Sequence, residues 1–126
     1  MSSLTDPAEN YSLNWLTGNT TTSPTGALKV ALVTANGSDS AAGTEVTGGS
    51  YARQTVTFSA AAAGATSNSG TLTWSAMPAC TVVGVEIYDS AGSPIRWWWG
   101  PLGATKTVNS VDTFTIAAGQ LQLTMA

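Results

Sequence analysis

The sequence contains no histidine and a single cysteine, Cys80. A Ser-His-Asp or Cys-His catalytic site is therefore excluded, as is a zinc site built from histidine or several cysteines. One cysteine cannot close a disulfide within the chain, so the fold needs no oxidising compartment. Only 9% of the residues are charged, against a usual share of about a quarter. We therefore expect no enzyme activity, no metal site and no cofactor.

The few charges are acidic in balance, with four basic and seven acidic residues and a formal net charge of −3. Such a chain offers no basic surface to phosphates, so we expect no nucleic-acid partner. No apolar run approaches the roughly 18 residues that a bilayer requires, and the first residues lack the basic and apolar regions of a signal peptide. We expect no membrane partner either.

A helix is predicted over residues 6–17. Asp6 is suited to the N-cap, Pro7 to the first helical position, and Glu9 completes the spacing of a capping box. Four apolar side chains recur at helical spacing and form a stripe that we expect to be buried: Ala8, Tyr11, Trp15 and Leu16.

From residue 27 onwards the apolar period changes to two, which indicates β-strands. Alternating runs occupy residues 28–32, 55–58, 71–74, 81–87, 95–99, 105–108, 114–116 and 121–125. Helical runs between the strands are missing, which argues against a parallel sheet. The prediction is one mainly β domain over residues 1–126, with an antiparallel, jelly-roll-like β-sandwich at 27–126 and one short N-terminal helix.

The run from 95 to 102 is the densest aromatic feature. Strand alternation places Trp97 and Trp99 on one face and Trp98 on the other. One interpretation is a core face with a subunit contact behind it; the alternatives are a sugar-stacking platform of Trp97 and Trp99, or core packing alone. Because arginine avoids cores unless it is paired, we assign Trp97 and Trp99 inward. Trp98 and Arg96 are then predicted to face a neighbouring subunit.

A second feature spans residues 45–54. The glycine pair Gly48-Gly49 could cradle a phosphate, but no helix start or lysine follows it, so a tight turn that leads into a strand is the better interpretation. Tyr51 and Arg53 fall on one face of that strand, where Arg53 would pair with a nearby acid or reach a partner. Tyr51 and Arg53 are therefore two further candidate interface residues.

The carboxylates do not suggest catalysis. Glu86 and Asp89 are the nearest strand-borne pair, but three residues apart on a strand they point to opposite faces. Asp39, Glu45 and Asp112 could join a calcium site, but they lack the ligand spacing of an EF-hand loop. Cys80, between apolar neighbours, is expected to be a buried and unreactive thiol.

Several stretches, in chain order, resemble small virion proteins of tailed bacteriophages that are commonly called phage tail fibre proteins. They are residues 4–16, 44–58, 85–89 and 97–102, and Lys106–Asn109 with Asp112 and Phe114. The resemblance covers most of the chain and implies a structural protein of the virion, made in the host cytoplasm.

The place of this protein in the virion has three interpretations. A 126-residue chain without repeats is short for a fibre, so we expect a capsid decoration, or cement, protein. It would bind the major capsid protein and copies of itself, as a dimer or trimer. The first alternative is a minor tail or tail-fibre-associated protein. The second is a carbohydrate-binding module for attachment to the host.

Overall fold

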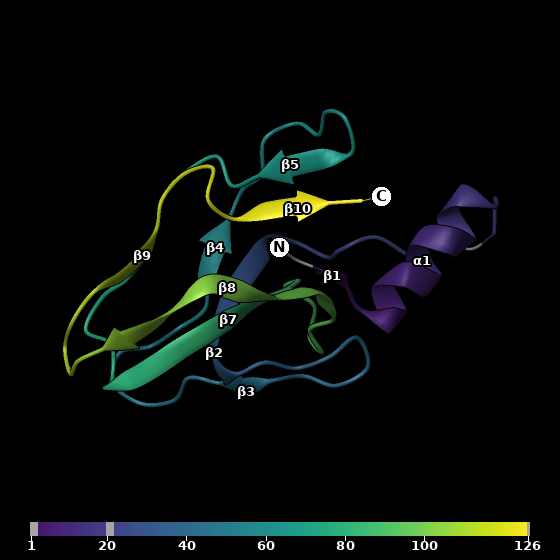
Figure 1. Ribbon diagram of the computed structural model, residues 1–126. Helices are drawn as coiled ribbons and strands as arrows, with labels where there is room; N and C mark the ends of the chain where they lie inside the picture. The colour runs from purple at the N-terminus through teal and green to yellow at the C-terminus, as the bar shows by residue number, and fades with distance from the viewer. Residues whose placement is uncertain (1–2, 20–21, 126) are drawn as a thin grey trace.

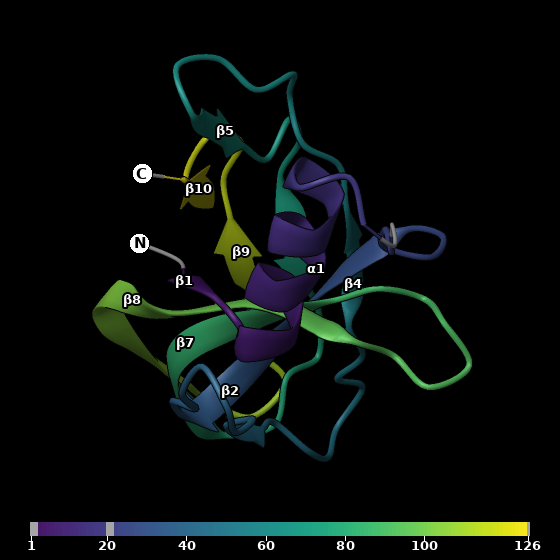
Figure 2. The same cartoon turned by 90° about the vertical axis from the view of Figure 1, so that its right-hand side faces the viewer.

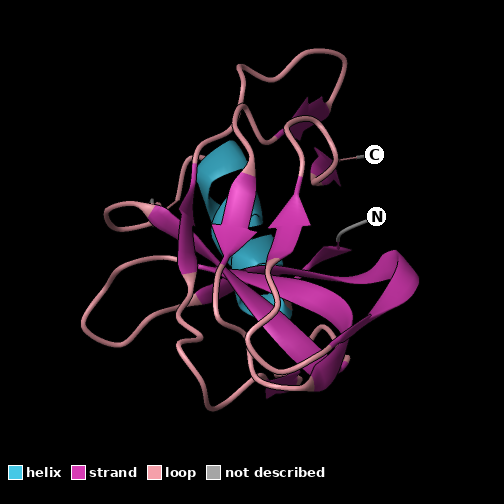
Figure 3. Ribbon diagram, turned by 90° about the vertical axis from the view of Figure 1, so that its left-hand side faces the viewer, coloured by secondary structure: helices cyan, strands magenta, loops and turns pink. Residues whose placement is uncertain are grey.

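The computed structural model describes residues 3–19 and 22–125, which form a mainly β architecture with one short N-terminal helix (Figure 1). In chain order the elements are β1 (Ser3–Leu4), α1 (Asp6–Leu16), β2 (Leu28–Ala35), β3 (Thr44–Glu45), β4 (Gln54–Val56), β5 (Ala65–Ser67), β6 (Leu72–Trp74), β7 (Cys80–Tyr88), β8 (Arg96–Val108), β9 (Phe114–Ile116) and β10 (Gln122–Thr124). The predicted fold class is confirmed. In Figure 3 strands make up nearly all of the regular structure, and the helix lies behind them.

The strands form one large and two small antiparallel sheets. The six-stranded sheet has the order β1-β8-β7-β2-β3, with β4 also paired to β2. The pairs β6–β9 and β5–β10 are separate two-stranded sheets. One apolar cluster joins them, because it draws buried side chains from β2, β7 and β8 of the large sheet and from β6, β9 and β10 of the small ones. The core therefore lies between the large sheet and the two small ones.

The centre of the large sheet is covered on both faces. All four residues from Val30 to Val33 in β2 are fully buried, although alternation predicted that only one face would be. The loop 36–43 covers the second face: a Cβ at Gly84 of β7 would lie 1.9 Å from the side-chain oxygen of Asn36. Only a residue without a side chain fits at Gly84, so this loop packs directly on the sheet.

The N-cap of helix α1 lies one residue earlier in the chain than we predicted. Thr5, not Asp6, is the N-cap, and its hydroxyl accepts a 3.3 Å bond from the backbone N–H of Ala8. The same hydroxyl donates to the carbonyl of Arg96 in β8 at 2.6 Å, and the N–H of Thr5 donates to the carbonyl of Trp97 at 3.1 Å. Thr5 is the N-cap because its hydroxyl bonds both to the N–H of Ala8 in the helix and to the carbonyl of Arg96 in β8.

The expected burial of the helix stripe is correct for its first half only. Ala8 is buried and Tyr11 packs on Trp97, whereas Trp15 and Leu16 are 65% and 67% exposed. Figures 1 and 2 show the reason: the helix stands at one end of the molecule, and its C-terminal half extends past the strands.

The strand predictions differ from the structure in one merged strand and in three short strands that they missed. The runs 95–99 and 105–108 are one 13-residue strand, β8, which continues through Gly100 and Pro101. Pro101 is tolerated because it lies beside an irregularity, where four residues of β8 face one residue of β7. The short strands β1, β3 and β5 lie outside the predicted runs.

Candidate functional site

Trp97 lies at the junction of α1 and β8, where it contacts a side chain of the helix and a side chain of the loop before β8. It is 6% exposed, and its ring centroid lies 5.5 Å from that of Tyr11. Its indole Nε1 donates a 3.2 Å hydrogen bond to the carboxylate of Asp89. The prediction that Trp97 is buried is confirmed, and its main contact is the helix.

Asp89 fixes the loop that precedes β8, a role that the sequence did not indicate. Its carboxylate accepts the indole bond and three backbone N–H bonds, from Thr25, Ala91 and Ile95 at 3.2, 3.3 and 2.9 Å. Burial disfavours the charged carboxylate, but the hydrogen bonds outweigh it and lower the pKa of Asp89. Asp89 is therefore a structural anchor beneath Trp97.

The predicted outward face of Trp98 is wrong, and so is the inward face of Trp99, which lies opposite Glu86 and bonds to Asp39. Arg96 lies on the outer face, as predicted. A bulge causes the error: Ile87 faces Trp98 and the next residue, Tyr88, faces Arg96, so that Trp97 is an extra residue. Trp98 consequently shares the face of Ile87 and packs against the core, partly buried. Arg96 lies on the opposite face. A contact of Trp98 and Arg96 with a neighbouring subunit stays a prediction. Only the exposed parts of these two side chains are available for it.

Arg96 forms an ion pair within the chain. One of its nitrogens lies 3.2 Å from Oε2 of Glu86, and another donates to the carbonyl of Ser38 at 2.6 Å. Glu86 is 1% exposed and also accepts bonds from the N–H of Gly43 and the hydroxyl of Tyr88, at 2.8 and 3.0 Å. The pair therefore holds the loop 36–43 on the sheet.

Tyr51 and Arg53 meet at Glu45, which confirms that Arg53 pairs with a nearby acid. Arg53 donates two bonds to the Glu45 carboxylate, at 2.9 and 3.0 Å, and the Tyr51 hydroxyl donates a third at 2.7 Å. Burial opposes the charged form of Glu45, but these bonds outweigh it and lower its pKa. The Arg53 guanidinium also lies 3.8 Å from the ring centroid of Tyr88. A contact of Tyr51 and Arg53 with a partner stays a prediction.

Tyr88 connects the two ion pairs. Burial and the neighbouring Glu86 carboxylate raise the pKa of Tyr88 to about 12. Its hydroxyl stays protonated at neutral pH and donates to Glu86. The outer face of the large sheet thus carries a continuous polar network, and it is satisfied within the chain.

The structure does not support catalytic or sugar-stacking interpretations of these residues. Glu86 and Asp89 are committed to separate networks, and the described residues contain no group of three or more possible metal ligands. Trp97 is covered by Tyr11, and Trp99 donates its indole N–H to Asp39 at 2.7 Å. The proposed platform of Trp97 and Trp99 is therefore wrong. Cys80 is half-buried, and burial raises the pKa of its thiol, which keeps it protonated.

Among the described residues, three of the five exposed large apolar side chains lie on the C-terminal half of α1. Leu13, Trp15 and Leu16 are 60%, 65% and 67% exposed. We call these three residues the apolar helix end. The spacing of Leu13 and Trp15 gave a signal that we missed, because positions two apart lie on different sides of a helix and cannot both pack on one sheet.

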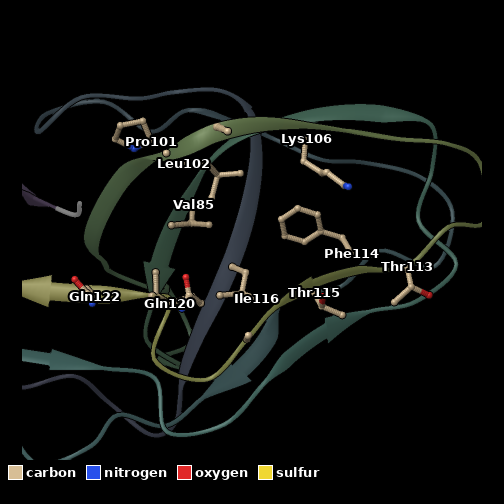
Figure 4. A pocket seen from close by; sticks show the side chains of 14 residues that line it. Val85, Pro101, Leu102, Lys106, Thr113, Phe114, Thr115, Ile116, Gln120 and Gln122 are labelled. Carbon is tan, nitrogen blue, oxygen red and sulfur yellow. The ribbon is translucent and has the colours of Figure 1, made fainter.

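A concavity lies between β8 and β9, at the other end of the molecule from α1. It has a volume of about 660 Å³. Figure 4 shows Val85, Leu102, Phe114 and Ile116 directed into it, with Gln120 and Gln122 near one end. We call this the β8–β9 groove. It depends on how distant strands are arranged, so no local sequence pattern reveals it.

The comparison with known families is decisive for the class of protein. A family described as podophage GP4 fiber I protein gp80 matches residues 3–124. The chain belongs to this family. A search of curated proteins finds no match.

Membership of the phage fiber family gives the protein a coarse role. It is a structural protein of a bacteriophage virion, as the resemblance of the five stretches implied. Its location on the capsid or on the tail does not follow from membership. Among the described residues, no helix has the length and apolar character to cross a membrane.

Proposed function

We propose that this protein is a structural subunit of the tail-fibre apparatus, and that the apolar helix end holds it in the virion. The observation that carries the proposal is the exposure of Leu13, Trp15 and Leu16 together on a helix that extends past the sheets. Exposed clusters of large apolar side chains mark protein contacts. The family description names a fiber protein, which favours the tail over the capsid.

The chemistry of this surface is that of a helix docking into an apolar groove. The helix is already held at its other end by Thr5 and by the Tyr11–Trp97 contact. Docking therefore costs little ordering of the backbone. In this proposal the protein acts by binding alone and performs no catalysis.

The energy available is sufficient for an anchor. The exposed parts of the three side chains amount to about 400 Å² of apolar surface. At about 25 cal/mol per Å², its complete burial contributes at most about 10 kcal/mol before the loss of rigid-body freedom is subtracted. A groove that covers one side of the helix buries part of this surface. We expect the helix end to bind its virion partner with moderate affinity, and we expect this affinity not to depend on salt concentration.

Incorporation into particles tests the proposal. Phage that lack the protein would be supplied with wild-type chain, with W15A/L16A, or with the control Asn14→Ala on the same exposed helix end. We expect W15A/L16A to lower the copies per particle at least ten-fold, measured by mass spectrometry against the major capsid protein, while its melting temperature stays unchanged. Incorporation of W15A/L16A at the level of the control would contradict the proposal.

The capsid decoration hypothesis predicts a different location. A small chain without repeats that docks through one apolar surface also suits the major capsid protein as its partner. Gold-labelled antibody on intact particles separates the two: label at the tail supports our proposal, and label over the head supports capsid decoration.

A further inference from the structure

We propose that the apolar helix end of one copy docks into the β8–β9 groove of another copy, so that the protein assembles with itself. This inference rests on the proposed function, because it names the partner of the same helix surface. It gives one partner to the exposed helix end and to the β8–β9 groove, whose lining is part apolar and part polar.

The two surfaces cannot meet within one copy. Figure 1 shows α1 at one end of the molecule and β9, which lines the groove, at the other. The start of the helix is fixed to β8 through Thr5 and Trp97, so the helix cannot swing round to the groove. A contact between them must join two copies.

The groove is suited to an apolar guest with polar surroundings. Leu102, Phe114 and Ile116 supply apolar surface, and Gln120 and Gln122 supply amides near one end. Its volume of about 660 Å³ lies within the range of protein pockets that bury a compact apolar group. A large apolar side chain such as that of Trp15 or Leu16 is a guest of this kind.

The charges of the two surfaces are complementary. Lys106 is the one charged residue that lines the groove. Helix α1 carries Asp6 and Glu9 in its first turn and no basic residue. Glu9 lies seven residues before Leu16, which is about 10 Å along a helix. A helix that docks in the groove therefore brings acidic residues towards a lining whose one charged residue is Lys106.

The area involved predicts a closed assembly. The helix end offers about 400 Å², roughly half of the 800 Å² that each partner contributes to a stable complex. In a closed ring or a reciprocal dimer every copy uses both its helix end and its groove, which doubles the buried area per copy. Closure is therefore favoured over an open pair.

Mixing two variants tests the inference. The helix variant is W15A/L16A; the groove variant is Ala104→Trp, which places a bulky ring at an exposed position of the groove lining. The control is Thr107→Trp, exposed on the same strand but outside the groove. Light scattering after size exclusion measures the mass, and circular dichroism confirms folding.

We expect a closed oligomer for the wild type and the control, and monomers for each variant alone. A mixture of the two variants should form a 1:1 complex, because one supplies the helix and the other the groove. Wild type that stays monomeric, a groove variant that still assembles, or a mixture that stays monomeric would each overturn the inference. If the wild type is monomeric but W15A/L16A is still lost from particles, the partner is another virion protein and the proposed function stands. If W15A/L16A is incorporated normally, the proposed function itself fails.

Discussion

Trp97 and Trp15 are the same residue type in two different situations. Trp97 is covered by Tyr11 and bonded to Asp89, whereas Trp15 on the same helix–strand unit is 65% exposed. The fold covers the ring of Trp97 and leaves most of Trp15 to solvent. The difference shows that aromatic content alone does not locate a binding surface; what matters is whether the fold already covers the ring.

The largest expected effect compares these two residues directly. Trp97→Ala should lower the free energy of unfolding by about 3–5 kcal/mol, because a buried ring leaves a cavity. It also removes a donor from Asp89. Trp15→Ala should change the same quantity by less than about 0.5 kcal/mol. Urea denaturation of the two variants measures both values, and equal losses would contradict the contrast.

The two ion pairs give the next contrast. Arg96→Met leaves the carboxylate of Glu86, 1% exposed, without its charged partner, so we expect a loss of about 3 kcal/mol. In the Arg53–Glu45 pair the side chains are 29% and 28% exposed, and solvent screens them. Arg53→Met should therefore cost only about 1 kcal/mol. A greater loss for Arg53→Met than for Arg96→Met, in the same denaturation assay, would reverse the assignment.

Period-two alternation predicted most strands, because β-strands with one covered face leave that pattern in the sequence. Residues 81–87 are the clearest case and lie within β7. The pattern failed at Trp98 because one extra residue, Trp97, reverses which face every preceding residue occupies. A bulge of this kind depends on the pairing with β7, and the run of three tryptophans does not reveal it.

The candidate site was less predictable than the fold. The pairing of Arg53 with an acid followed from strand spacing, and Glu45 is close in the chain. The partners of Asp89 include Thr25, 64 residues away, and the β8–β9 groove joins strands that do not pair with each other. Such contacts are set by the tertiary arrangement, so local patterns contain no trace of them.

The smallest expected effect concerns pH and again contrasts a covered group with an uncovered one. The folded-state pKa of Asp89 is lowered, so its contribution to stability is present above the unfolded-state pKa, near 3.9, and is lost as the pH falls through the folded-state value. Wild-type protein should therefore become less stable below about pH 4. Asp89→Asn, which cannot titrate, should be less stable at pH 7 and should lose part of this pH dependence. Asp112→Asn, at an exposed position, is the matched control and should keep it. Melting temperatures between pH 3 and pH 7 measure the slopes, and identical slopes for Asp89→Asn and Asp112→Asn would show that the network beneath Trp97 does not depend on the charge of Asp89.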